Sequence, residues 1–298
     1  MISSGFIGFH TARTGDTDSL LSFFSLMMVL SFLTYLLNGQ KIHILLAFIF
    51  LTLAFATKLY ASLLFIPAFF VVLILNKKLK DAILNWYFFS GLSLFLASSV
   101  TLVYLREMQT PGYIDAIIFN DAGRLFTAFN EKVPSSSFYL DNIFVERFSY
   151  GIILFLLGTM AVFYKKDIKN KLILNSVLIC LLSYFLIINF SKTKMVWYDM
   201  PMYPLLSIIA AYPIVLLLKL ALDQERKNKN LLKVVFMGIV FSYPLFLMFR
   251  QSQDNTIFMG DKIIESNEMF LYDGYKKNKN LDGVKVYYHG WDGSLLFY

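Results

Sequence analysis

Charged residues and cysteine are scarce in this 298-residue chain. Only 16% of its residues are charged, against about 25% in a soluble domain, while 57% are hydrophobic and the mean hydropathy is +0.61. The single cysteine, Cys180, excludes an intrachain disulfide. Residues 1–8 have neither a basic n-region nor a full apolar core, so we expect no cleavable signal peptide. These deficits exclude a soluble globular domain of ordinary size and predict a polytopic membrane protein.

Long apolar runs recur along the chain and predict an all-α fold with about eight transmembrane helices, although several runs are shorter than the roughly 20 residues of a perpendicular span. Only Lys58 and Leu59 separate the second run from the third, so this pair is either two tight spans or a re-entrant hairpin. The expected segments are 19–37, 42–57, 60–76, 85–105, 149–164, 171–190, 201–220 and 231–249.

Lysine and arginine are unevenly distributed between alternate loops, which predicts the orientation in the membrane. The richer loops, expected to be cytoplasmic, contain Lys41; Lys77, Lys78 and Lys80; Lys165, Lys166, Lys169 and Lys171; and Lys219, Arg226, Lys227, Lys229 and Lys233. With eight spans, both termini are then periplasmic or luminal, together with Lys58, the loop 106–148 and the segment 191–199. The abundance of Phe, Ile, Lys and Asn is typical of an AT-rich bacterial genome, and with the apolar runs it leads us to expect a bacterial inner-membrane protein. Because the net charge of +7 lies in short clusters between apolar runs, we expect no nucleic-acid partner.

Three parts of the chain are expected outside the membrane: an acidic loop at 1–18, the loop 106–148 and a tail at 250–298. The transmembrane domain would cover 19–249. Within the long loop, a stretch from Tyr113 to Phe129 looks amphipathic, which is typical of an interfacial helix and also of a lid over a surface site. The tail contains the β-like run 284–288 and is expected to form an incomplete small α/β cap.

A polar cluster, 10–18, directly precedes the first apolar run and contains His10, Arg13, Asp16 and Asp18. The two aspartates either cap the following helix, where they complement its dipole, or act in chemistry. Several cations share the less basic face and could bind the phosphate of a lipid carrier: Arg13, Lys58, Arg124, Lys192 and Lys194. A lone lysine at a helix end, however, usually extends its amine to the interface.

Carboxylates beside a phosphate-binding cluster suggest group transfer, because a carboxylate can deprotonate an acceptor hydroxyl. Asp16 and Asp18 could also hold a divalent metal ion that offsets charge on a leaving phosphate. Trp197 and Tyr198 fit an interfacial aromatic belt and could equally stack on a sugar ring. The sequence contains no Gly-rich phosphate loop, Ser-His-Asp order or His-x-x-x-His zinc pattern.

Four motifs resemble, in the right order, those of membrane glycosyltransferases with the GT-C architecture. The nearest resemblance is to the dolichyl-phosphate-mannose protein mannosyltransferase and lipid A aminoarabinose transferase group, families 39 and 83. The matching stretches are His10-x-x-Arg13-Thr14-Gly15-Asp16-x-Asp18; Ala56-Thr57-Lys58; Asn120-Asp121-x-x-Arg124 followed by Phe138-Tyr139-Leu140; and Lys192-Thr193-Lys194-x-x-x-Tyr198-x-x-Pro201-x-x-Pro204.

The resemblance implies transfer of a sugar from a polyprenyl-phosphate donor to a protein, lipid or glycan acceptor, with inversion. It implies that His10, Arg13, Asp16 and Asp18 belong to the catalytic cavity, with the two aspartates near the donor phosphate or a metal. It further implies a place in the external loop for Asn120, Asp121 and Tyr139, and donor contacts from Lys58, Arg124, Lys192, Lys194 and Tyr198.

Two departures from the family pattern affect the functional expectation. Leu59 stands where the family has a glycine. We expect the family's first external loop, which carries the general base, to be missing together with about three spans before Met1, and part of the cap to be missing after Tyr298. If the chain is complete, it should have no transferase activity. The alternatives are a transporter or flippase for a lipid-linked anionic sugar, and an O-antigen polymerase or ligase.

Overall fold

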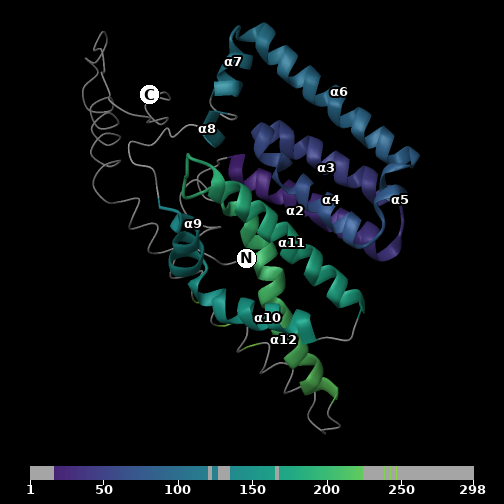
Figure 1. The fold of residues 1–298 in the computed structure, drawn as a ribbon, viewed down its shortest axis with the longest axis vertical. Coiled ribbons are helices and arrows are strands. Elements are labelled where there is room, and N and C mark those ends of the chain that lie inside the picture. The colour runs from purple at the N-terminus through teal and green to yellow at the C-terminus, as the bar shows by residue number, and fades with distance from the viewer. Residues whose placement is uncertain are drawn as a thin grey trace, which may run out of the picture. The chain divides into compact units, whose positions relative to one another are not determined.

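The computed structural model describes residues 17–119, 123–126, 135–164 and 168–223, together with residues 238, 242 and 246. Where secondary structure forms in these residues, it is helical, and none of them belongs to a β-strand. The chain divides into two compact units, Met1–Ile239 and Val240–Tyr298. All elements given below lie in the first unit (Figure 1). The expected cap in the tail lies outside the described residues.

Within the described residues, five helical stretches are long and apolar enough to cross a membrane, or six if one bent pair forms a span. The multi-pass helical membrane protein predicted from the sequence is therefore confirmed. The number of eight spans stays a prediction, because the expected span 231–249 lies almost wholly outside the described residues, and α10 (Ile152–Tyr164), with 13 residues, counts towards a span only within the bent pair. The five stretches are Thr17–Asn38, Ile42–Leu75, Trp86–Gln109, Lys169–Phe190 and Met200–Lys219.

The longest of these stretches, Ile42–Leu75, passes along α2 (Thr17–Asn38) in one direction and then returns beside it. A straight helix of its 34 residues would be about 51 Å long. Yet Lys41, just before it, and Asp81, just after it, form an ion pair of 2.9 Å. Asp81 also accepts a hydrogen bond from the hydroxyl of Tyr35, near the end of α2. The chain therefore reverses between α3 (Ile42–Lys58) and α4 (Ile66–Leu75), which η1 (Leu59–Phe65) connects.

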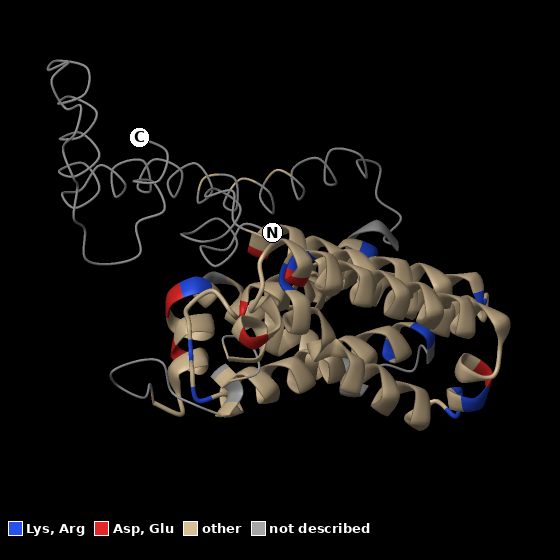
Figure 2. Ribbon diagram, turned by 90° about the horizontal axis from the view of Figure 1, so that it is seen from above, with Lys and Arg blue, Asp and Glu red and all other residues tan. Residues whose placement is uncertain are grey.

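Because the chain reverses, the helices share two common ends, and the charged residues lie mainly at the ends of the long helices (Figure 2). We call the first the Lys58 end; it contains Asp18, Lys58 and the segment 191–199. We call the second the Lys78 end; it contains residues 36–41 and 76–85, including α5 (Leu79–Ile83). Lys78 belongs to the second end because its Nζ donates to the carbonyl of Leu36 at 2.7 Å.

Small residues allow helices to approach closely at two places, as is common where lipid removes the hydrophobic drive for association. A Cβ atom at Gly91 of α6 (Trp86–Gln109) would overlap the ring of Phe48 on α3. A Cβ atom at Gly158 of α10 would overlap the carbonyl of Ile209 on α12 (Tyr203–Asp223). Replacement of either glycine would therefore push two helices apart.

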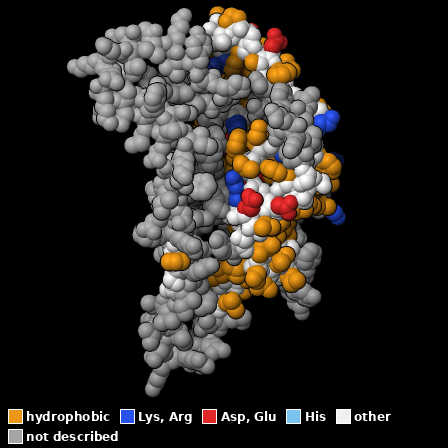
Figure 3. Space-filling model, turned by 90° about the vertical axis from the view of Figure 1, so that its left-hand side faces the viewer, with side chains coloured by type: hydrophobic (Ala, Val, Ile, Leu, Met, Phe, Trp, Pro, Cys, Tyr) orange, Lys and Arg blue, Asp and Glu red, His pale blue; other side chains and the backbone are white. Residues whose placement is uncertain are grey.

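The outer surfaces of the helices are apolar, which suits contact with lipid. Only Gly91 is buried in the whole of α6, while Leu94, Leu96 and Val100 are exposed. In Figure 3, hydrophobic side chains cover much of the described part of the visible face. The best-buried interior forms where α2, α4, α11 (Ile168–Phe190) and α12 meet, and includes Tyr35, Val72, Val177 and Ile209.

The long loop between α6 and α10 contains short helices. Glu107 accepts hydrogen bonds from the backbone N–H groups of Gly112 and Ile114, at 2.8 and 2.7 Å, which turns the chain sharply after α6. Helices α7 (Tyr113–Ile117) and α8 (Gly123–Phe126) follow. The stretch 113–129, predicted to be amphipathic, is helical in these two pieces, and its residues 120–122 and 127–129 lie outside the described residues. α9 (Phe138–Leu140) and the π-helix η3 (Asp141–Arg147) complete the loop.

Candidate functional site

The centre of the candidate site is an ion pair between Lys58 and Asp18. The Nζ of Lys58 lies 2.5 Å from Oδ1 and 2.6 Å from Oδ2 of Asp18, although the two residues are 40 positions apart. Asp18 lies in the first turn of α2 and is only 2% exposed, whereas the Lys58 side chain is 28% exposed. Removing one partner from a buried pair leaves an uncompensated charge, which typically costs about 3–5 kcal/mol. The pair therefore fixes the start of α2 against the turn after α3.

Lys58 reaches this position because the backbone breaks immediately after it. Lys58 leaves helical geometry with φ −148°, and Leu59 adopts φ +37° and ψ −119°. Positive φ is favourable for glycine and costs other residues free energy.

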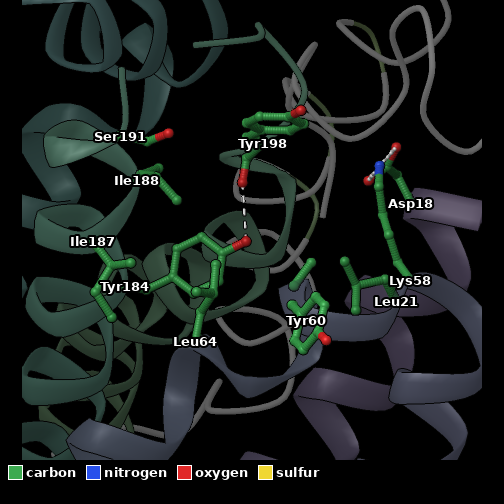
Figure 4. Close-up of a pocket in the computed structure, with 11 residues that line it drawn as sticks. Asp18, Leu21, Lys58, Tyr60, Leu64, Tyr184, Ile187, Ile188, Ser191 and Tyr198 are labelled. Atoms are coloured by element: carbon green, nitrogen blue, oxygen red, sulfur yellow. Dashed lines mark hydrogen bonds and ion pairs between the residues drawn. The ribbon is translucent and has the colours of Figure 1, made fainter. Parts of the chain in front are cut away.

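The aromatic side chain of Tyr198 lies on the other side of the Lys58 amine. Its ring centroid is 5.7 Å from Nζ, within the range of a cation–π interaction. The hydroxyl of Tyr184, on α11, donates to the carbonyl of Tyr198 at 3.0 Å and so holds this part of the loop against the helix (Figure 4). Two segments distant from Lys58 in sequence, those of Asp18 and Tyr198, therefore converge on its ammonium group.

A cavity of about 120 Å³ adjoins these residues. Asp18, Lys58 and Ser191 give it a polar side, while Leu64, Ile187 and Ile188 form an apolar wall. A cavity with a cation on one side and hydrocarbon on the other matches an amphipathic ligand with an anionic group.

The loop after α11 is tied to the segment that precedes η3. Lys194 is 6% exposed, and its Nζ donates to the carbonyl of Ser135 at 3.0 Å. Burial lowers the pKa of Lys194. The hydroxyl of Tyr139 bonds to both the N–H and the carbonyl of Met195, each at 3.2 Å. Because Lys194 is engaged in this way, it stabilises the loop, whereas Lys192 is exposed.

A second buried carboxylate, Asp199, lies at the end of the same loop and was not singled out from the sequence. Its Oδ2 accepts hydrogen bonds from Nδ2 of Asn142 at 2.6 Å and from the hydroxyl of Tyr203 at 2.9 Å. Arg147 Nη1 lies 3.9 Å from Oδ1. Burial raises the pKa of Asp199 to about 6, against the opposing effect of Arg147 and the two hydrogen bonds. The only sequence signal was its place directly before Met200-Pro201 in the fourth motif.

The structure brings Asp18, Lys58 and Tyr198 together and places Tyr139 and Lys194 in the adjoining loop contacts. Other predicted site residues lie outside the described residues: His10, Arg13, Asp16, Asn120 and Asp121. Arg124 belongs to α8, but its side chain is not described. Among the residues that the structure describes, no three His, Cys, Asp or Glu side chains gather as metal ligands. The metal pair predicted from Asp16 and Asp18 stays a prediction, since Asp16 is outside this set.

No protein-family model, curated protein or solved structure matches the chain. The fold and the site define a multi-pass helical membrane protein with an ion-paired lysine beside an amphipathic cavity. A functional interpretation therefore depends on the chemistry of that cavity.

Proposed function

We propose that the chain is a membrane glycosyltransferase of the GT-C type, which binds a polyprenyl-phosphate sugar in the cavity beside Lys58. The observation that carries this proposal is the convergence of Asp18, Lys58 and Tyr198 on one cavity with an apolar wall. The Lys58 ammonium binds the donor phosphate. The wall of Leu64, Ile187 and Ile188 accepts the first units of the lipid.

In the proposed reaction, an acceptor hydroxyl oxygen forms a bond to the anomeric carbon while the bond from that carbon to the phosphate oxygen breaks. The hydroxyl proton passes to a carboxylate base, and the polyprenyl phosphate leaves with both bonding electrons. Lys58 stabilises the charge that develops on the leaving phosphate. Because both oxygens of Asp18 face Lys58, we assign Asp18 to positioning that ammonium rather than to proton abstraction.

The remaining predicted residues enter this proposal through the resemblance alone. His10, Arg13 and Asp16 directly precede Asp18 in the sequence and are assigned to the same cavity. The proposed divalent metal ion is assigned to Asp16, because both oxygens of Asp18 already face the ammonium of Lys58. The acceptor is a protein, a lipid or a glycan.

The position of the ion pair favours transfer over transport. Transporters commonly place ionisable groups near the membrane midplane. Asp18 lies in the first turn of its helix and Lys58 is the last residue of α3, so the pair is at a helix end. A site at that depth suits a donor whose phosphate stays at the membrane surface.

Titration of the purified protein with undecaprenyl phosphate tests the proposal. Lys58→Met should weaken binding about 10- to 100-fold, because a hydrogen bond to a charged group contributes about 1.5–3 kcal/mol. Lys219→Met, which removes an exposed lysine from the end of α12, is the matched control and should bind as the unmodified protein does.

Two further arms keep the test decisive. Undecaprenol, which lacks the phosphate, should bind weakly and with no dependence on Lys58. The double variant Asp18→Leu/Lys58→Met removes both charges, so it avoids leaving a buried carboxylate unpaired, and it should match Lys58→Met. Unchanged affinity for undecaprenyl phosphate in both Lys58 variants would contradict the proposal.

A further inference from the structure

A second and larger cavity lies towards the Lys78 end, away from the Lys58 cavity. Its volume is about 250 Å³, and apolar surface lines it throughout. Its walls come from α2, α3, α4, α5 and α6, represented by Phe32, Phe48, Phe69, Ala82 and Phe95. An apolar cavity of about 150 Å³ is already enough to stay dry and to bind a hydrocarbon such as benzene. This cavity therefore suits a hydrocarbon ligand.

The hydrocarbon available to such a cavity is the acyl chain of a membrane lipid. The cavity is walled by helices of three candidate spans, and Phe70 lines it while remaining 44% exposed on the outside of α4. The interior is thus continuous with the lipid-facing surface. An empty cavity would forfeit dispersion contacts along its whole wall, whereas an acyl chain would restore them.

The positive charge beside the cavity favours a lipid with an anionic headgroup. Residues 41 and 77–81 include four lysines and one aspartate, a net charge of 4 − 1 = +3. Lys41 pairs with Asp81, and Lys78 donates to the Leu36 carbonyl. Lys77 and Lys80 are exposed and form no ion pair with any described residue.

These two lysines lie close along the chain to residues that line the cavity. Lys80 precedes Ala82 and Ile83 of α5, and Lys77 follows Leu73 of α4 by four residues, in the turn after that helix. Basic groups beside a gap between membrane helices are suited to the headgroup of an anionic lipid.

We propose that this cavity and the two exposed lysines form a binding site for one anionic glycerophospholipid. One acyl chain occupies the cavity, and Lys77 and Lys80 hold the phosphate. The site is separate from the Lys58 cavity, and its existence does not depend on glycosyl transfer.

Lipid retention by the detergent-purified protein, measured by native mass spectrometry, tests the site with phosphatidylglycerol and phosphatidylcholine as probes. The unmodified protein should retain one phosphatidylglycerol in preference to phosphatidylcholine. Lys77→Gln/Lys80→Gln should weaken phosphatidylglycerol binding about 30-fold, since each lysine near an anionic headgroup contributes a factor of about five. Lys219→Gln, another exposed lysine, should change nothing.

A cavity-filling variant separates this site from general adhesion of lipid to a basic surface. Ala47, on α3, lines the cavity, so Ala47→Trp should fill part of it and reduce retention of both lipids. Equal retention of the two lipids by the unmodified protein, or undiminished phosphatidylglycerol binding by the double glutamine variant, would overturn the proposal. Normal retention of phosphatidylglycerol by Ala47→Trp, with an unchanged melting temperature, would overturn it too. None of these outcomes bears on undecaprenyl phosphate binding at Lys58.

Discussion

The strained turn after Lys58 provides a sharp test of the site's architecture. Leu59 has φ +37°, a conformation that costs a non-glycine residue about 1–3 kcal/mol. Glycine avoids that cost but loses about 0.5–1 kcal/mol more conformational entropy than alanine on folding. We therefore expect Leu59→Gly to be more stable than Leu59→Ala by about 0.5–2 kcal/mol.

The comparison with alanine isolates the backbone effect, because both variants lose the half-buried leucine side chain. A matched leucine in regular helix should give the opposite sign. Leu53 is exposed within α3, and Leu53→Gly should be less stable than Leu53→Ala by about 1 kcal/mol, since glycine weakens a helix interior.

Unfolding of the four variants in detergent micelles, followed by circular dichroism, measures these differences. A Leu59→Gly protein less stable than Leu59→Ala would refute the turn geometry that presents Lys58 to the cavity. If glycine were less stable than alanine at both positions 53 and 59, both residues would lie in ordinary helix.

The loop that carries Tyr198 supports two further predictions. The pKa of Asp199 is raised to about 6 from an ordinary value near 3.9, so its contribution to stability is complete below about pH 4 and is lost as the pH rises through 6. Asp199→Asn should abolish this loss of about 3 kcal/mol, measured as the difference between unfolding free energies at pH 4 and pH 7; an equal pH dependence in both proteins would contradict the burial of Asp199. Lys194→Met should lower the melting temperature because it leaves the Ser135 carbonyl without its donor, whereas Lys192→Met, at an exposed lysine of the same loop, should not. Equal effects of the two substitutions would place Lys194 at the surface.

Hydropathy and the distribution of lysines were enough to place Asp18, Lys58 and the segment 191–199 at the same end of the helices. A membrane helix must run from one end of the bundle to the other, so counting apolar runs assigns the loops between them to alternate ends. The short spacing between two runs left the path of 42–76 open. The ion pair of Lys58 with Asp18 at the start of α2, together with the hydrogen bond of Tyr35 to Asp81 near its end, shows that both runs extend along α2.

The details that the sequence did not reveal depend on the rotation and registry of packed elements. The contacts of Asp199 with Asn142 and Arg147 join segments more than 50 positions apart through a π-helix, and no hydropathy pattern specifies that register. The bounds of single helices were equally hidden, because the composition of an apolar run such as 149–164 does not fix where the helix begins. Here α10 begins only at Ile152.

Photo-crosslinking from the wall of the Lys58 cavity tests most directly whether a lipid phosphate binds there. Ala61 lines the cavity and can be replaced by benzoylphenylalanine, after which the protein is irradiated with undecaprenyl phosphate and digested for mass spectrometry. We predict an adduct at position 61 that falls sharply when Lys58→Met is added and persists when Lys219→Met is added. An adduct of equal yield in all three proteins, or none in any, would contradict the assignment of this cavity to a lipid-phosphate donor.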